Sequence, residues 1–185
     1  MKLKTIIFLS IFLLANISGI AQKYFTRTAE VIFFSEAPTE NIEAENRQVT
    51  CILNTENGEI AFSIQMKGFH FEKALMEEHF NENYVESHKF PKSTFKGKVV
   101  DFDKIDIINA GTHKVSVVGE ILLHGVAKKI KADGEIRIDG DKIMLTSKFD
   151  LRIEDYKIDI PKAVINKIAE SIEVSLSATL TEYKK

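Results

Sequence analysis

Apolar and polar residues alternate one by one along most of the second half of the chain. From residue 130, one face of the chain carries Ile130, Ala132, Gly134, Ile136 and Ile138. The residues between them are charged, and the same alternation returns at residues 143–151 and 172–180. A period of two is typical of a β-strand with one buried and one solvated face. The stretch Asp139-Gly140-Asp141 predicts a tight hairpin turn between the first two strands.

Shorter runs earlier in the chain follow the same pattern. Residues that share one face are Ile60, Phe62, Ile64 and Met66 in one run, and Val115, Val117, Ile121 and Leu123 in another. Further strands are expected near residues 29–35, 49–53 and 93–101. About eight strands joined by short loops predict an antiparallel sheet. Closing this sheet into a barrel buries its apolar face and removes both edges, so the predicted fold class is an all-β antiparallel barrel.

Two short helices are predicted between the strands. The first covers residues 72–83, where Leu75, Met76 and Phe80 recur at helical spacing. The second covers residues 162–170, because Pro161 suits a first helical turn and is followed by Val164, Ile165 and Ile168.

The first 21 residues have the layout of a secretory signal peptide. Lys2 and Lys4 form a basic head, residues 6–15 are apolar, and small residues lead up to Ala21. The apolar run is shorter than the roughly 20 residues of a membrane-spanning helix, and no later run is longer. We therefore expect a signal peptide at residues 1–21, one domain at residues 22–185, export to the periplasm or the medium, and no stable membrane insertion.

The charge and the cysteine content reduce the number of possible partners and reactive groups. The formal net charge is −2, and it becomes −4 when Lys2 and Lys4 are removed with the leader. This mild acidity argues against nucleic acid as a partner, because nucleic-acid binding usually requires a basic face. Cys51 is the only cysteine, so no internal disulfide can form, and its apolar neighbours predict a buried, inert thiol.

The stretch HFNENYVESHKFPKSTFKGKV is the densest run of candidate chemistry. Zinc sites place their ligands at tight spacings, whereas His70, His79 and His88 are nine residues apart, across a predicted change from helix to strand. The acidic residues Glu77, Glu78, Glu82 and Glu86 are expected on the solvated side of the helix. The chain contains no nucleophile elbow and no phosphate-binding loop. We therefore predict no catalytic residue and no metal ligand.

Three segments together resemble the YceI-like family of secreted lipid-binding proteins: MKGFHFEKALMEEHFNENYVESHKFPKSTFKGKV, GEILLHGVAKKI and FDLRIEDYKI. The resemblance extends from about Thr28 to the C-terminus. Its features are His79-Phe80, Tyr84, Phe90-Pro91, Phe95, Gly119, Leu123-His124-Gly125-Val126 and Asp155-Tyr156. The His124-Gly125 pair is expected to form a hairpin turn fixed by bonds of the histidine side chain. The chain departs from better-known members in having no tryptophan, and no histidine in its first strand.

The resemblance implies a lipocalin-like barrel that holds a polyisoprenoid or fatty-acyl lipid, with no other cofactor. We expect the following residues to line the ligand site: Phe62, Ile64, Met66, Phe80, Tyr84, Phe95, Ala132, Gly134, Phe149 and Ala178. A barrel of about eight strands either holds one small ligand or is filled by side chains. If Gly134 and Ala178 leave room for a tail, replacing either with Phe is expected to block lipid uptake without unfolding the protein.

Three functions stay open at this point. The first is an exported carrier that binds an apolar small molecule or lipid and is not an enzyme. The second is an interaction protein or stress-related structural protein with a filled barrel, which acts through its outer faces or a loop at residues 38–46. The third is an enzyme that acts on lipids near His79 and Tyr84. The sequence also leaves open whether two copies form a homodimer.

Overall fold

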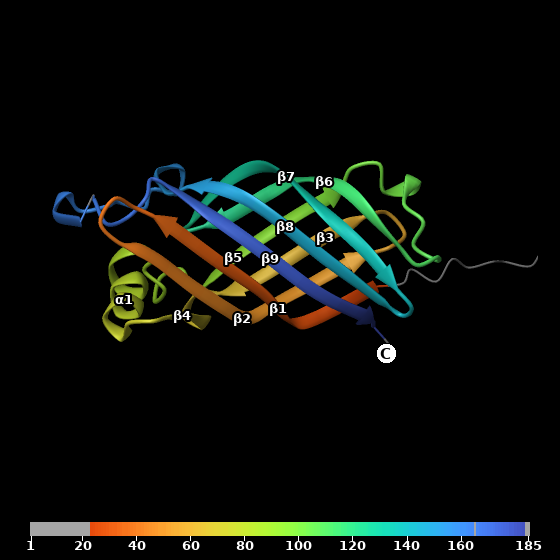
Figure 1. Ribbon diagram of the computed structural model, residues 1–185, viewed down its shortest axis with the longest axis horizontal. Helices are drawn as coiled ribbons and strands as arrows, with labels where there is room; N and C mark the ends of the chain where they lie inside the picture. The colour runs from red at the N-terminus through yellow and green to blue at the C-terminus, as the bar shows by residue number, and fades with distance from the viewer. Residues whose placement is uncertain (1–22, 165, 184–185) are drawn as a thin grey trace, which may run out of the picture.

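The computed structural model describes residues 23–164 and 166–183, and this part of the chain folds into an antiparallel β-barrel (Figure 1). Eight of the described strands follow one another around the barrel in the order β1-β9-β8-β7-β6-β5-β3-β2, and β2 pairs with β1 to close it. The short strand β4 pairs with the other half of β2. The bounds are β1 Lys23–Glu36, β2 Asn41–Asn54, β3 Glu59–Gln65, β4 Phe69–Phe71, β5 Lys92–Val99, β6 Gly111–Leu123, β7 Val126–Asp139, β8 Lys142–Arg152 and β9 Ser171–Glu182. The predicted fold class is confirmed.

Two hairpin turns fix the register of the central strands. β7 and β8 are joined by Gly140-Asp141, with φ of +62° at Gly140, which suits the first position of a type II′ turn. β6 and β7 are joined by His124-Gly125, and both residues have positive φ, as a type I′ turn requires. The predicted turns are therefore confirmed.

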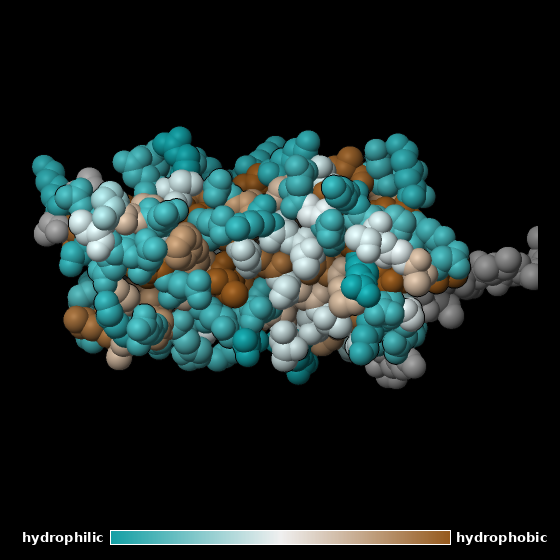
Figure 2. Space-filling view, in the orientation of Figure 1, coloured by the Kyte–Doolittle hydropathy of each residue, from teal (hydrophilic) through white to brown (hydrophobic). Residues whose placement is uncertain are grey.

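The barrel has one packed end and one end covered by irregular structure. At the packed end the inward side chains of four strands meet, and each is at most 3% exposed: Leu53, Ile138, Ile143 and Leu180. The other end carries β4, α1 (Ala74–His79) and the segment between β8 and β9, all at the left in Figure 1. Polar residues cover most of the outer face in Figure 2, where β8, β9 and β1 lie toward the viewer.

One predicted helix forms and the other does not. α1 continues into a turn of π-helix, η2 (Phe80–Tyr84), so the helix predicted over residues 72–83 is confirmed with slightly shifted ends. The helix predicted over residues 162–170 is wrong: the described residues are a single 3-10 turn, η5 (Lys162–Val164), and turns, bends and irregular chain at residues 166–170. Short isolated helices are marginal, and the β-branched residues here have low helix propensity.

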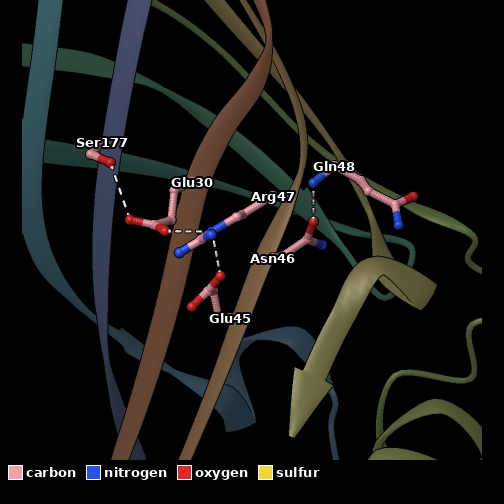
Figure 3. Close-up of polar contacts among 6 residues, drawn as sticks. All are labelled: Glu30, Glu45, Asn46, Arg47, Gln48 and Ser177. Atoms are coloured by element: carbon pink, nitrogen blue, oxygen red, sulfur yellow. Dashed lines mark hydrogen bonds and ion pairs between the residues drawn. The ribbon is translucent and has the colours of Figure 1, made fainter.

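Strand β2 is longer than predicted because of a buried asparagine. Asn46 is fully buried where β2 changes partner from β4 to β3. Its amide donates a hydrogen bond to the carbonyl of Gln65 (2.7 Å), and its side-chain oxygen accepts one from the N–H of Gln48 (2.8 Å; Figure 3). These bonds replace the ladder bonds that are missing at the change of partner. The loop predicted over residues 38–46 is therefore wrong, and only residues 37–40 connect β1 to β2.

Strands β7 and β8 separate toward the covered end. They pair only between Gly134 and Asp139, so residues 126–133 of β7 pair with β6 alone and residues 148–152 of β8 pair with β9 alone. The hydroxyl of Ser147 donates a hydrogen bond to the carbonyl of Asp133 (2.7 Å) at the point of separation. Beyond this fork the ladder between β7 and β8 does not continue.

Candidate functional site

The barrel encloses a cavity of about 550 Å³, so its interior is not filled by side chains. The cavity extends from α1 and the β8–β9 segment down to a floor formed by Ile60, Val99, Ile136 and Leu145. Along β8 it runs from Leu151 to Leu145, six residue steps or roughly 20 Å of strand. Its volume lies within the range of about 300–1,000 Å³ that is typical of small-molecule sites.

Nine of the ten predicted lining residues border this cavity: Phe62, Ile64, Met66, Phe80, Tyr84, Phe95, Ala132, Gly134 and Phe149. Ala178 does not. Its side chain faces inward, but it pairs with Leu145 at the cavity floor and lies in the packed core beyond it. Alternation along a strand gives the face of a residue but not its depth in the barrel, which explains this difference.

The inner wall is apolar, and its serines already have hydrogen-bond partners. Ser35 accepts a hydrogen bond from the N–H of Ala169 (2.8 Å), Ser93 donates one to the carbonyl of Leu122 (3.0 Å), and Ser147 bonds to Asp133. Each hydroxyl is therefore used in a hydrogen bond between two segments of the wall. A ligand inside the cavity meets mainly aliphatic and aromatic surface, which favours an apolar tail.

Four phenylalanines pack together where α1 joins the barrel. Phe80 lies 5.5 Å from Phe33, 5.5 Å from Phe69 and 5.1 Å from Phe71, measured between ring centroids. All four border the cavity. Of the four, only Phe80 is among the ten predicted lining residues. Alternation along β1 and β4 was the signal that could have added Phe33, Phe69 and Phe71 to that list.

The mouth of the cavity has a mixed rim, formed by Glu40, Lys73, Leu75, His79 and Lys167. Leu75 is 62% exposed at the start of α1. The ammonium of Lys73 lies 2.7 Å from the carboxylate of Glu40. This hydrogen bond lowers the pKa of Glu40 and raises the pKa of Lys73. The rim therefore combines an exposed apolar side chain with an ion pair and a second lysine.

The other candidate chemical groups do not gather into one site within the described residues. Glu77 accepts a hydrogen bond from the N–H of Phe71 (3.3 Å) and lies 3.5 Å from His70. Burial raises the pKa of the Tyr84 phenol, and no hydrogen bond joins it to His79 within the described residues. Burial also raises the pKa of the Cys51 thiol far above its ordinary value, as expected for an inert cysteine. Across residues 23–164 and 166–183, no three His, Cys, Asp or Glu side chains are grouped to hold a metal ion.

A comparison with protein-family models matches residues 25–180 to the YceI-like domain. This match covers most of the chain. The chain belongs to the YceI-like family. No curated protein matches it.

Three solved structures with the same fold extend this comparison. A polyisoprenoid binding domain from Saccharophagus degradans, implicated in plant cell wall breakdown, is 16% identical, with 87% of this chain and 98% of that chain covered and a TM-score of 0.76. BcnA from Burkholderia cenocepacia is 12% identical, with 83% and 96% covered and a TM-score of 0.68. A YCEI protein from Campylobacter jejuni is 16% identical, with 81% and 90% covered and a TM-score of 0.62. At these identities the similarity shows the fold alone.

Several residues of the YceI-like resemblance meet in one structural cluster. The two ring nitrogens of His124 are within hydrogen-bond distance of the carbonyl oxygen of Tyr156 (3.1 Å) and of the carboxylate of Glu86 (3.0 Å). The ring of Phe90 packs on His124 with centroids 4.7 Å apart, and a side chain at Gly125 would collide with Phe90. This cluster ties the β6–β7 turn to the end of the helix and to the 3-10 turn after β8. The predicted role of His124, fixing the turn by side-chain bonds, is confirmed.

The expected signal peptide, residues 1–21, lies outside the described residues. None of the helices in the described part of the chain is long and apolar enough to cross a membrane.

Proposed function

We propose that this YceI-like protein is an exported, non-enzymatic carrier that holds one long apolar lipid, with an isoprenoid or fatty-acyl tail, inside its barrel. The observation that carries the proposal is the cavity of about 550 Å³ inside the barrel, with its apolar wall and bonded serine hydroxyls. The polyisoprenoid binding domain from Saccharophagus degradans has the same fold, which supports an isoprenoid as one class of ligand.

The length of the tail follows from the energetics of burial. Each methylene removed from water contributes about 0.8 kcal/mol. Micromolar affinity corresponds to about −8 kcal/mol, and association costs at least about 4 kcal/mol in lost freedom of motion. Roughly 15 or more buried methylene groups are therefore needed, which is the length of a long acyl or prenyl chain. A short apolar molecule would bind weakly.

Two further features support export and carriage rather than catalysis. The basic, apolar and small-residue layout of residues 1–21 is typical of a secretory signal peptide. The serines of the cavity wall are bonded to backbone groups rather than to a histidine or carboxylate that could activate them. The ligand-binding residues we propose are the nine predicted residues that border the cavity.

The proposal is tested by organic extraction of the purified protein followed by mass spectrometry. We expect a long-chain lipid in a ratio of about one molecule per barrel, and rebinding of the same lipid after its removal. An empty protein that also fails to bind added prenyl or acyl chains would contradict the proposal.

A further inference from the structure

The rim offers the places where a charged head group of the proposed lipid can sit. Besides the phenol of Tyr84, the ionisable side chains that border the cavity are Glu40, Lys73, His79, Glu135 and Lys167. Four of them belong to the rim, and Glu135 is an exposed residue of β7 at the fork with β8. A charge deeper in the apolar cavity would lose its hydration without a partner. A charged amphiphile must therefore bind with its tail inside and its head at the mouth.

Lys167 is held at the mouth by bonds on both sides of it. The carbonyl of Asn166 accepts hydrogen bonds from the N–H (3.3 Å) and the hydroxyl (2.8 Å) of Thr39. The N–H of Ala169 donates to the buried hydroxyl of Ser35 (2.8 Å). These contacts fix the segment after η5 against the β1–β2 connection, beside Glu40. The backbone on either side of Lys167 is thus positioned by Ser35 of β1 and by Thr39 of the β1–β2 connection. The lysine side chain takes no part in these bonds.

The two lysines of the rim differ in how they are paired with carboxylates. Lys73 forms an ion pair with Glu40 (2.7 Å), and the field of Lys167 acts on the same carboxylate. The carboxylate of Glu72 also acts on Lys73, which leaves Lys73 well compensated. Lys167 makes no ion pair with a carboxylate of the described residues. Of the two rim lysines, Lys167 is therefore the one that is not engaged in an ion pair in the described part of the chain, which suits a head group that carries a negative charge.

We infer that the lipid carried by this protein has a singly charged anionic head, a carboxylate, that pairs with Lys167 while the tail fills the cavity. This inference rests on the proposed function and narrows it to acidic amphiphiles. The exposed side chain of Leu75, which also belongs to the rim, would contact the first methylene groups of the tail. The head stays accessible to water, so the preference for the acid is modest.

The test compares hexadecanoic acid with its methyl ester, which has the same chain and a neutral head. Both are titrated into delipidated protein at neutral pH and low salt. We expect the acid to bind about two- to fivefold tighter than the ester, the size of an exposed ion pair, and we expect salt to weaken this preference. Equal binding of acid and ester by the natural protein would overturn the inference while leaving the carrier function intact. If neither lipid binds, the proposed function itself fails.

Three variants separate the role of Lys167 from a general charge effect. Lys167→Gln is expected to remove the preference for the acid and leave binding of the ester unchanged. Lys167→Arg is expected to keep the preference, because the charge is conserved. Lys162→Gln is the matched control, since Lys162 lies in the same segment but does not border the cavity. An unchanged preference in Lys167→Gln, or an equal loss in Lys162→Gln, would overturn the inference.

Discussion

The ring of Phe95 lies over the backbone of Gly119, so closely that a methyl group on this glycine would be 2.5 Å from Cζ of the ring. Gly119 lies opposite Gly97 in the β5–β6 ladder, and the same ring covers both glycines. Since Phe95 also borders the cavity, this pair of glycines sets how far the ring can lie back against the wall. The width of the cavity at this level therefore depends on two residues without side chains.

Gly119→Ala is expected to destabilise the fold by about 1–3 kcal/mol, because the added methyl also meets the carbonyl oxygen of Lys96 at 2.5 Å. Denaturant unfolding measures this change. Gly111→Ala on the same strand is the control, because its methyl would meet only ordinary contacts, the nearest at 3.5 Å. Equal stability of the two variants would contradict the close packing at Gly119.

Asn46→Ala is expected to lower the free energy of unfolding by about 2–4 kcal/mol, because it leaves the N–H of Gln48 and the carbonyl of Gln65 without their partner. Arg47→Ala provides the comparison on the next residue. Arg47 pairs with Glu30 (2.9 Å) and with Glu45, but its side chain is 69% exposed (Figure 3). Loss of this surface cluster is expected to cost less than about 1 kcal/mol. A larger effect at Arg47 than at Asn46 would contradict this assignment.

Glu86 is expected to make stability depend on pH in the acid range. Hydrogen bonds from Lys89, and then from His124, lower the pKa of this carboxyl below its ordinary value of 4.5. Its contribution is therefore complete above pH 4.5 and is lost as the pH falls through the lower pKa of the folded state. Melting temperatures of the natural protein and of Glu86→Gln should differ at neutral pH and converge in acid.

The control for this pH series is Glu43→Gln, a carboxylate on the exposed side of β2 that takes no part in the His124 cluster. The difference in melting temperature between the natural protein and Glu86→Gln is the quantity to follow. If this difference stays constant down to low pH, the charge of Glu86 is not what stabilises the turn.

The fork between β7 and β8 is expected to show in hydrogen exchange. Residues 127–133 of β7 have a ladder partner only in β6, whereas residues 134–138 pair on both sides. Amides of residues 127–133 that point away from β6 should exchange much faster than amides of residues 134–138, because they have no backbone acceptor across the fork. Uniform protection along the whole of β7 would contradict the unpaired edge.

The barrel could be predicted from the sequence because alternation determines which side chains face inward. The same alternation also predicted nine of the ten expected residues that border the cavity. Alternation does not give depth, so Ala178 was assigned to the cavity although it lies in the packed end. For the same reason the proposed Phe test at that position would disturb the core. A side chain at Gly134 would meet the backbone of Thr146, so that substitution would disturb the fold as well.

Other features depend on contacts that no local pattern reveals. The run NIEAEN is polar enough to resemble a loop, and only the partners of Asn46 in β3 and β4 show why it is a strand. The apolar residues near Ile168 resemble a helix, but the segment is instead held by Thr39 and Ser35, more than 100 residues away in the sequence. The rim around Lys167 forms only through these long-range bonds.

A matched pair of Ala→Phe variants on β7 tests the carrier function most directly. Ala132 borders the cavity and Ala127 is exposed on the outer face of the same strand. The measurement is the amount of lipid per protein molecule after extraction, with melting temperature as a check of folding. We expect Ala132→Phe to lose most of its bound lipid while Ala127→Phe keeps the natural amount. Equal lipid content in the two folded variants would contradict a ligand site inside the barrel.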